Sequence, residues 1–187
     1  FKKGKAMYAE NGAINEIIDS IFFPDSNGSI LKNVLLETYT GVRCVNCPVA
    51  NQLALEIQER YDNKVIVLNV HAGFLAEFPS FNLTTLEGEE WWSFFNFQSN
   101  PIGTINRKMV NGGYAFGSPS WEDAVAEAIQ EEATVDMNAE VSYNDENREL
   151  KVDVVSKFLA DMHGTYSLTV CVIEDPIVGI HYTPEGV

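Results

Sequence analysis

The sequence predicts an α/β domain followed by a partial antiparallel β domain, and the order of its apolar segments supports this prediction. Between Val34 and Val70 an apolar strand, a helical pattern and a second apolar strand follow one another, an order that gives a right-handed crossover and parallel strands. From Val135 onward apolar and polar residues alternate strictly, and no helix separates the strands, which is typical of an antiparallel sheet. We therefore expect an N-terminal helical segment over residues 1–30, an α/β domain over 31–133 and a β domain over 134–187.

The N-terminal segment carries apolar residues at helical spacing, and Pro24 marks the expected end of the helix. These residues are Ile14, Ile17, Ile18, Ile21 and Phe22. The α/β domain then begins with an expected strand over Val34–Tyr39, a helix that ends near Tyr61 and a strand over Val65–Val70.

An aromatic-rich stretch follows these elements. Thr85 has a side chain suited to an N-cap, so we expect a helix from there through Trp91-Trp92 and Phe94-Phe95. Its aromatic side chains either belong to the core, which is the commoner arrangement, or form a wall that faces a substrate.

The remainder of the α/β domain starts at Asn100-Pro101. A proline is allowed at the start of a strand, so we expect a strand over Ile102–Met109. Asn111-Gly112-Gly113 is typical of a hairpin turn, and Ser120 is expected to begin a last helix that ends near Ala133.

The β domain is predicted from three segments. They are Val135–Tyr143, Leu150–Phe158 and Tyr166–Ile173. Cys171 lies in the third segment, where we expect it to be a small core residue. Three strands are too few for a closed sandwich, so we expect this domain to be incomplete or to be completed by a partner protein.

Charge and composition exclude several classes of function. A formal net charge of −15 disfavours binding to nucleic acid and to anionic lipid. No apolar stretch is long enough to span a bilayer. The chain starts at Phe1, so we expect a mature or trimmed form whose membrane attachment is only through a lipid anchor upstream. We expect no cofactor.

The motif with the clearest chemistry is Cys44-Val45-Asn46-Cys47. It stands between a strand and a helix, the context of a redox pair, whereas a structural zinc site requires a second pair of ligands. The helix N-terminus and Arg43 both favour a thiolate at Cys44, while Cys47 is placed one turn further to resolve a mixed disulfide. We therefore expect Cys44 to be the exposed thiol of low pKa and Cys47 to be buried.

His71 follows the second strand, and parallel strands end at the same edge of a sheet. We therefore expect His71 near Cys44 and Cys47, where the three side chains would offer copper or zinc two thiolates and an imidazole. His163 and His181 lie in the predicted β domain, and neither is assigned a role.

The order of elements from Val34 to about Ala133 resembles the thioredoxin superfamily, whose C-x-x-C opens the first helix of the α/β domain. The resemblance implies a thioredoxin-like fold and a cis peptide bond before Pro101. In that superfamily the proline faces the cysteines and shapes the groove for a substrate strand.

The sequence departs from thioredoxin proper around the motif. Arg43 stands in place of a tryptophan, and Val45-Asn46 replaces Gly-Pro. Thr38 stands where the superfamily has a buried acid that assists proton transfer from the second cysteine. Glu37, one position earlier, would tune the thiol pKa in its place if the strand is bulged.

A narrower resemblance rests on Leu36–Pro48, on Asn106-Arg107 after the proline strand, and on Ile173-Glu174-Asp175. These segments are similar to the family named for a 28-kilodalton outer membrane protein of Bacteroidetes-type bacteria. The resemblance implies a lipid-anchored protein of the periplasm or outer membrane, with a thioredoxin-like domain and a partial immunoglobulin-like β domain.

Three functions remain open from the sequence. The first is thiol–disulfide exchange with protein thiols and disulfides, in which Cys44 attacks, Cys47 resolves and Pro101 orients the substrate. The second is a surface binding or adhesion module in which Cys44–Cys47 is a static disulfide. The third is a copper or zinc carrier that adds His71 to the two thiolates.

Overall fold

The structure is a computed structural model that describes residues 16–18, 30–62, 64–78, 81–174, 177 and 179–182. The described residues divide into two compact units. The α/β unit contains Asn33–Gln130 and, from the far end of the chain, residues 179–182. The β unit contains residues 16–18 and 30–32 together with the described residues from Glu131 to Ile177. The predicted α/β class is therefore confirmed for the central part of the chain.

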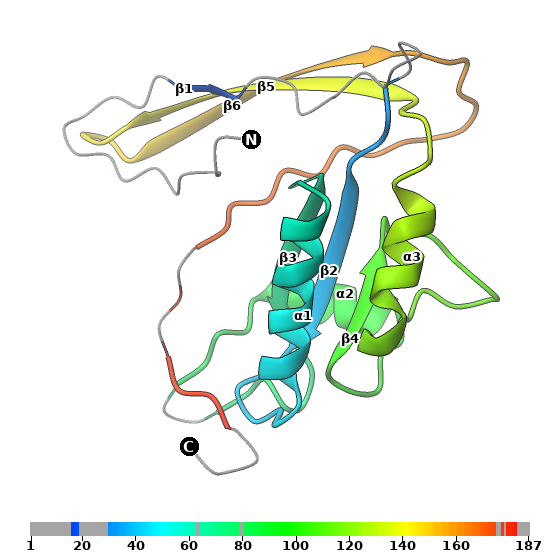
Figure 1. The fold of residues 1–187 in the computed structure, drawn as a ribbon. Coiled ribbons are helices and arrows are strands. Elements are labelled where there is room, and N and C mark those ends of the chain that lie inside the picture. Colours follow the sequence, from blue (N-terminus) through cyan, green and yellow to red (C-terminus); the bar gives the residue numbers. More distant parts are fainter. Residues whose placement is uncertain are drawn as a thin grey trace. The chain divides into compact units, whose positions relative to one another are not determined.

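The α/β unit is built on a three-stranded sheet in the order β3-β2-β4 (Figure 1). The central strand β2 (Val34–Thr40) pairs in parallel with β3 (Val65–His71). On its other side β2 pairs in antiparallel with β4 (Ile102–Ile105). The predicted strand–helix–strand crossover is confirmed, and β4 is shorter than the segment predicted up to Met109.

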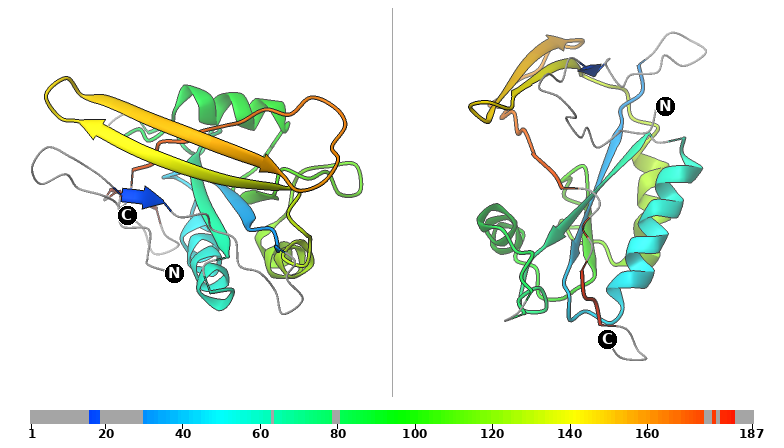
Figure 2. Two further views of the ribbon diagram at one scale, coloured as in Figure 1. Left: turned by 90° about the horizontal axis from the view of Figure 1, so that it is seen from above. Right: turned by 90° about the vertical axis from the view of Figure 1, so that its left-hand side faces the viewer.

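Helices lie on both faces of this sheet. Helices α1 (Cys47–Arg60) and α3 (Trp121–Ala128) cover one face, and α2 (Leu86–Phe94) lies on the other (Figures 1 and 2). Thr85 caps α2 as predicted, because its Oγ1 accepts a hydrogen bond from the Gly88 N–H at 3.0 Å.

The last helix is shorter than predicted. A 3-10 turn over Ser118–Ser120 leads into α3, and the Ser120 side chain makes no capping hydrogen bond. The backbone of Ser120 is already helical, so its side chain does not have the extended geometry of a good N-cap. Helix α3 ends at Ala128, before the predicted Ala133.

Each face of the sheet has its own apolar core, because side chains alternate along a strand. The core under α1 and α3 contains Val34, Leu36, Ala50, Ala54, Ile57, Val65, Ile105, Trp121, Val125, Ala128 and Ile129. The core under α2 contains Tyr39, Val70, Ala72, Phe95 and Phe97, with Trp91 and Trp92 packed against it. Most of the aromatic stretch is therefore core, as the commoner of the two alternatives predicted.

The β unit contains a second three-stranded sheet, in the order β1-β5-β6. Strands β5 (Val135–Asn144) and β6 (Glu149–Phe158) form the predicted antiparallel hairpin. Strand β1 (Glu16–Ile18) pairs in antiparallel with β5, so the predicted N-terminal helix is wrong at these residues. Its apolar pattern is also compatible with a strand, and the partner in β5 decides between the two. The remainder of that predicted helix lies outside the described residues.

The predicted third strand over Tyr166–Ile173 is wrong, since these residues form neither a helix nor a strand. An alternating pattern forms a strand only where a neighbour supplies backbone hydrogen bonds, and the described part of the sheet ends at β6. Cys171 is exposed as a free cysteine, so the expectation that it belongs to a core is also wrong.

Gly103 in β4 lies at a close contact between the sheet and α3. A Cβ atom there would lie 2.8 Å from Nε1 of the buried Trp121 and 3.0 Å from the backbone oxygen of Glu37. The Trp121 ring is itself held by a hydrogen bond from Nε1 to the Phe116 carbonyl at 2.9 Å.

Gly103→Ala is therefore expected to lower the free energy of unfolding by about 2 kcal/mol, the usual cost of overpacking. Gly113→Ala is the matched control, because its nearest neighbouring atom would lie 4.0 Å from the new Cβ. Urea denaturation of both variants measures the difference, and equal stabilities would contradict the packing described for Trp121.

Candidate functional site

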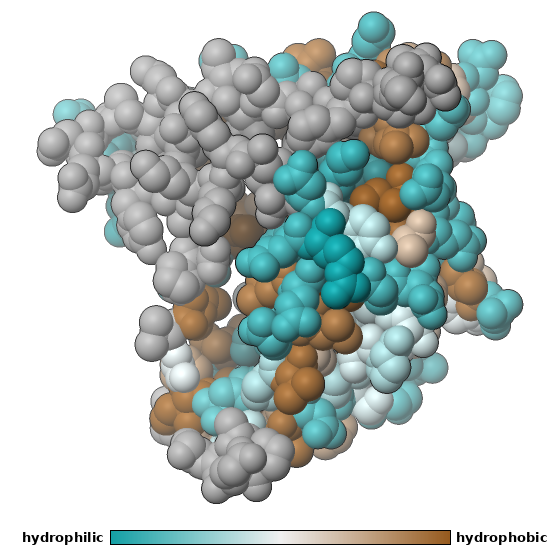
Figure 3. All heavy atoms as spheres, viewed as in Figure 1, coloured by the Kyte–Doolittle hydropathy of each residue, from teal (hydrophilic) through white to brown (hydrophobic). Residues whose placement is uncertain are grey.

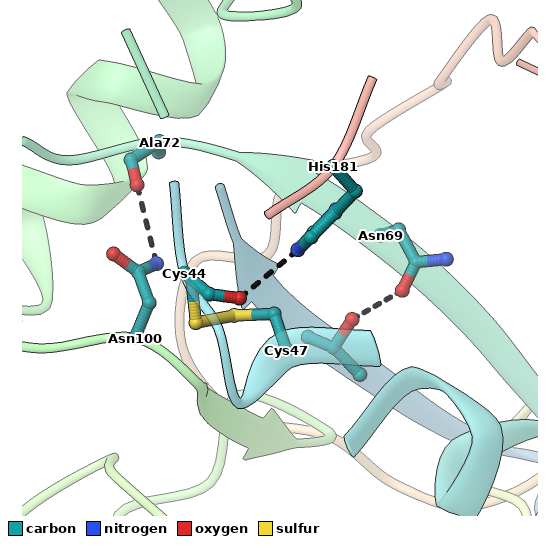
Figure 4. The surroundings of a disulfide bond; sticks show 7 residues. Cys44, Cys47, Asn69, Ala72, Asn100 and His181 are labelled. Carbon is teal, nitrogen blue, oxygen red and sulfur yellow. Dashed lines mark hydrogen bonds between the residues drawn. A yellow bond between two sulfur atoms is a disulfide. The ribbon is translucent and has the colours of Figure 1, made fainter. Parts of the chain in front are cut away.

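The candidate site is a disulfide between Cys44 and Cys47, at the point where the chain leaves β2 and enters α1 (Figure 4). The two Cα atoms are 5.3 Å apart. Cys47 is the first residue of α1, and its N–H donates to the Cys44 carbonyl at 3.0 Å. Pro48 follows without cost, because the N–H of the first helical turn has no partner within the helix. The predicted placement of the cysteine pair at a strand-to-helix junction is confirmed.

Both cysteines are buried in this oxidised form. Cys44 is 2% exposed and Cys47 is fully buried, so the expectation that Cys44 is the exposed member of the pair is wrong here. One cause is the loop that follows β3, which packs closely on Gly41: an added Cβ there would lie 2.5 Å from the Leu75 carbonyl carbon.

Arg43 is exposed, and its guanidinium binds a backbone carbonyl of the loop after β3. Its Nη2 donates to the Phe74 carbonyl, and its backbone N–H donates to the Leu75 carbonyl at 3.0 Å. Arg43 therefore holds the loop after β3 against the loop before Cys44. Arg43 is the sequence neighbour of Cys44, and its positive charge would favour a Cys44 thiolate after reduction of the disulfide.

Four polar residues lie on the α1 face of the sheet, close to the edge from which the cysteine loop emerges. They are Thr38 and Thr40 of β2 and Asn69 and His71 of β3, which continue the alternation of Leu36 and Val67. Thr38 donates through Oγ1 to Oδ1 of its register partner Asn69, and Figure 4 shows Asn69 beside the disulfide. This face therefore carries hydroxyl, amide and imidazole groups and no carboxylate from β2 or β3.

Glu37 lies on the opposite face of the sheet, which corrects its predicted role near the cysteines. The bulge that would turn it toward Cys47 is absent, since β2 pairs with β3 residue for residue from Val34 to Thr40. The fully buried carboxylate accepts hydrogen bonds from Arg107 Nε at 2.8 Å, Arg107 Nη2 at 2.5 Å and Thr104 Oγ1 at 2.9 Å. Glu37 is thus a structural ion-pair residue, and its Arg107 partner also lies 4.3 Å above the Trp91 ring.

The peptide bond between Asn100 and Pro101 is cis, as the resemblance implied. Asn100 lies beside Cys44 in Figure 4, and its Nδ2 donates to the Ala72 carbonyl at 3.3 Å. Because β4 begins at the next residue, Ile102, and pairs there with Tyr39, Pro101 enters the sheet at the edge that carries the disulfide. The structure therefore brings the predicted residues Cys44, Cys47 and Pro101 to one edge of the sheet.

His71 also reaches this edge, as its position at the end of β3 predicted. Its Nδ1 is buried without a hydrogen-bond partner, and burial, with a smaller contribution from His181, lowers its pKa from 6.5 to about 4. Among the described residues, no group of three or more His, Cys, Asp or Glu side chains is arranged to hold a metal ion. The predicted metal set of Cys44, Cys47 and His71 is therefore not assembled in this disulfide form.

The sequence reasoning missed His181, which the fold brings to the site from the end of the chain. Its Nε2 lies 3.0 Å from the Cys44 carbonyl oxygen, across 137 positions of sequence. A carbonyl oxygen can only accept, so His181 Nε2 is the donor. No local pattern around His181 could have predicted this contact.

A shallow groove of about 530 Å³ lies in the same unit. It is lined by Phe94–Ser99, Ile102 and Gly112–Ala115. Phe94 is 72% exposed there, whereas Phe95 and Phe97 are buried, so only a part of the aromatic stretch faces solvent. Val45 and Val49 are also exposed at the start of α1, and Figure 3 shows hydrophobic residues among hydrophilic ones on the face that carries this helix.

Comparisons with known proteins leave the family of the chain open. The sequence matches no known protein family and no curated protein. Among solved structures it is similar to an Agrobacterium tumefaciens protein from a structural genomics programme, with 10% identity and a TM-score of 0.40 over 66% of this chain and 72% of that one. Among the described residues, no helix is long and apolar enough to cross a membrane.

The Glu37–Arg107 pair predicts a large loss of stability when one partner is removed. Arg107→Met leaves a buried carboxylate without its cation, so we expect the free energy of unfolding to fall by about 3 kcal/mol. Glu37→Gln combined with Arg107→Met should recover part of this loss. Arg60→Met is the control, since Arg60 pairs with Glu122 at the surface and should cost less than about 1 kcal/mol. Urea denaturation measures all four proteins, and a small effect of Arg107→Met would contradict the buried pairing.

The lowered pKa of His71 predicts that stability falls on acidification. Between pH 6.5 and about 4 the unfolded chain binds a proton at this residue and the folded protein does not, so stability is lost as the pH falls through this window. We expect wild type to lose about 2 kcal/mol more than His71→Asn between pH 7 and pH 4. His163→Asn, at an exposed histidine, should behave as wild type. Parallel stability curves for wild type and His71→Asn would refute the prediction.

Proposed function

We propose that this protein carries out thiol–disulfide exchange with other proteins through Cys44 and Cys47. The observation that supports the proposal most is the closed disulfide at the N-terminus of α1, with Asn100-Pro101 on the same edge of the sheet. Positive potential at a helix N-terminus stabilises a thiolate, which is the reactive form of cysteine.

In the proposed reaction the reduced protein acts on a disulfide of its substrate. The Cys44 thiolate attacks one substrate sulfur, the substrate S–S bond breaks, and the released substrate thiolate takes a proton from water. Cys47, as a thiolate, then attacks the Cys44 sulfur, re-forms the disulfide seen here and releases the second substrate sulfur. Two electrons pass from the protein to the substrate, and the reverse sequence oxidises a substrate dithiol.

Proton transfer from Cys47 would use groups other than a buried carboxylate. Glu37 lies on the other face of the sheet and is bound to Arg107. Thr38 and Asn69 bond to each other on the α1 face, and His71 ends the same row of residues. We infer that water accepts this proton, since burial lowers the pKa of His71 to about 4 and leaves its imidazole a weak base.

The fold and location belong to the same proposal. We infer a thioredoxin-like α/β domain joined to a partial immunoglobulin-like β domain, in a lipid-anchored protein of the cell envelope. The sheet order β3-β2-β4 with helices on both faces and the resemblance of Leu36–Pro48 support this reading. The periplasm is also an oxidising compartment in which such a disulfide persists.

A second candidate function is a binding module in which the disulfide is static. The burial of both cysteines favours it, because an exchange reaction requires access to one sulfur. A titration of the Cys44–Cys47 pair against glutathione separates the two functions. A midpoint within the range of known exchange proteins, about −120 to −270 mV, supports exchange, and one below about −300 mV supports the static module.

Cysteine variants test the exchange reaction directly. Cys44→Ser is expected to lower disulfide reductase activity on a model protein disulfide at least 100-fold, since the attacking sulfur is lost. Cys47→Ser should instead accumulate a mixed disulfide between Cys44 and the substrate, visible by mass spectrometry. Cys171→Ser is the control and should retain activity, because Cys171 is a free cysteine outside the α/β unit. Trapping through Cys171, or no trapping at all, would argue against the proposed roles.

A further inference from the structure

Residues 179–182 reach the disulfide from the end of the chain. They belong to the α/β unit although more than 40 residues of the β unit separate them from α3 in the sequence. In Figure 4 His181 lies next to Cys44, on the side away from Asn100. The candidate site is therefore flanked by the Asn100-Pro101 segment on one side and by this short segment, Gly179–Tyr182, on the other.

Backbone groups of the loop before Cys47 hold this segment. The Tyr182 N–H donates to the Val42 carbonyl at 2.9 Å, and His181 Nε2 donates to the Cys44 carbonyl at 3.0 Å. Both acceptors are main-chain oxygens: the backbone N–H at position 182 could come from many sequences, whereas the contact with Cys44 requires a side-chain donor such as His181. Val42 and Cys44 belong to one turn, closed by the hydrogen bond from the Cys44 N–H to the Gly41 carbonyl at 2.9 Å, so a single short loop presents both acceptors.

Aromatic side chains of the loop after β3 complete the contact surface. The Tyr182 ring packs edge-on against Phe78, with ring centroids 5.9 Å apart. Gly179 passes so close to Phe81 that an added Cβ would lie 2.0 Å from the ring. The surface thus combines two backbone acceptors with two aromatic rings. It accommodates a small residue, Gly179, against one ring and an aromatic residue, Tyr182, against the other.

We propose that this surface is a docking site for an extended polypeptide, and that Gly179–Tyr182 occupies it in cis and shields the disulfide. The part of the proposal that concerns substrates rests on the proposed exchange function: a substrate strand would replace Gly179–Tyr182 before its sulfur reaches Cys44. The shielding itself does not depend on that function, because it follows from the contacts with Val42 and Cys44 and from the 2% exposure of Cys44.

The shielding predicts a slow reaction of the disulfide with a small reductant. Dithiothreitol attacks one sulfur as a thiolate, breaks the Cys44–Cys47 bond and leaves with both electrons transferred, as its own cyclic disulfide. The attack proceeds only in the fraction of molecules whose segment has left the surface. Weakening the contacts raises that fraction and hence the rate.

The test compares the full chain with the double variant His181→Ala, Tyr182→Pro, which removes the ring donor and the backbone donor together. We expect disulfide reduction by dithiothreitol at pH 7 to become about 25-fold faster, because two hydrogen bonds are lost and each net hydrogen bond changes the docking equilibrium by a factor of about five. Quenching with an alkylating reagent and mass spectrometry counts the reduced Cys44 and Cys47. Thermal melting checks that the variant is folded.

The matched control is His163→Ala, Tyr166→Pro, which makes the same two changes at exposed residues of the β unit. It should be reduced at the wild-type rate. A reduction rate of the His181/Tyr182 variant within twofold of wild type would overturn the proposal, as would an equal acceleration in the control. A faster rate combined with no substrate trapping by Cys47→Ser would keep the shield and reject the exchange function.

Discussion

The structure of the α/β unit depends on the burial of β2 on both faces and along both edges. The strand pairs with β3 on one side and β4 on the other, and all of its residues except Leu35 are buried. Leu36 and its neighbours on one face form the core with α1 and α3, while Tyr39 on the other face forms the core with α2. A one-residue slip would exchange these two faces. The same strand delivers Cys44 to the edge of the sheet, so the packing of β2 also fixes the position of the candidate site.

This constraint explains how polar groups are distributed around the disulfide. A charged residue inside β2 is tolerated only with a partner, and Arg107 supplies one for Glu37 on the α2 face. The α1 face, which carries the cysteines, has instead the neutral residues Thr38, Thr40 and Asn69 and a histidine whose pKa is lowered by burial. The environment of Cys47 is therefore buried, polar and without a carboxylate from β2 or β3.

The first and last described segments of the chain each join a unit whose other residues are distant in sequence. Residues 16–18 add a strand to the sheet of the β unit, and residues 179–182 join the α/β unit beside the disulfide. Both segments are held by backbone hydrogen bonds. Many sequences can form such bonds, so the amino-acid composition does not reveal them. The cysteine motif is thus flanked by Asn100 and His181, which come from two other parts of the chain (Figure 4).

Elements with a local sequence pattern could be predicted without the structure. Periodicity placed β2, α1, β3 and the β5–β6 hairpin, the N-cap chemistry of Thr85 placed α2, and the three-residue spacing of Cys44 and Cys47 placed both at one helix start. Strands that need a distant partner could not be predicted in this way. Residues 16–18 form β1 because β5 pairs with them, whereas Tyr166–Ile173 form no strand because no described strand pairs with them. The ion pair of Glu37 with Arg107 and the contact of His181 with Cys44 also depend on the fold, since each joins residues at least 70 positions apart. Local patterns record which face of an element is apolar, whereas pairing and docking are decided by competition between distant segments for the same hydrogen bonds and the same buried surface.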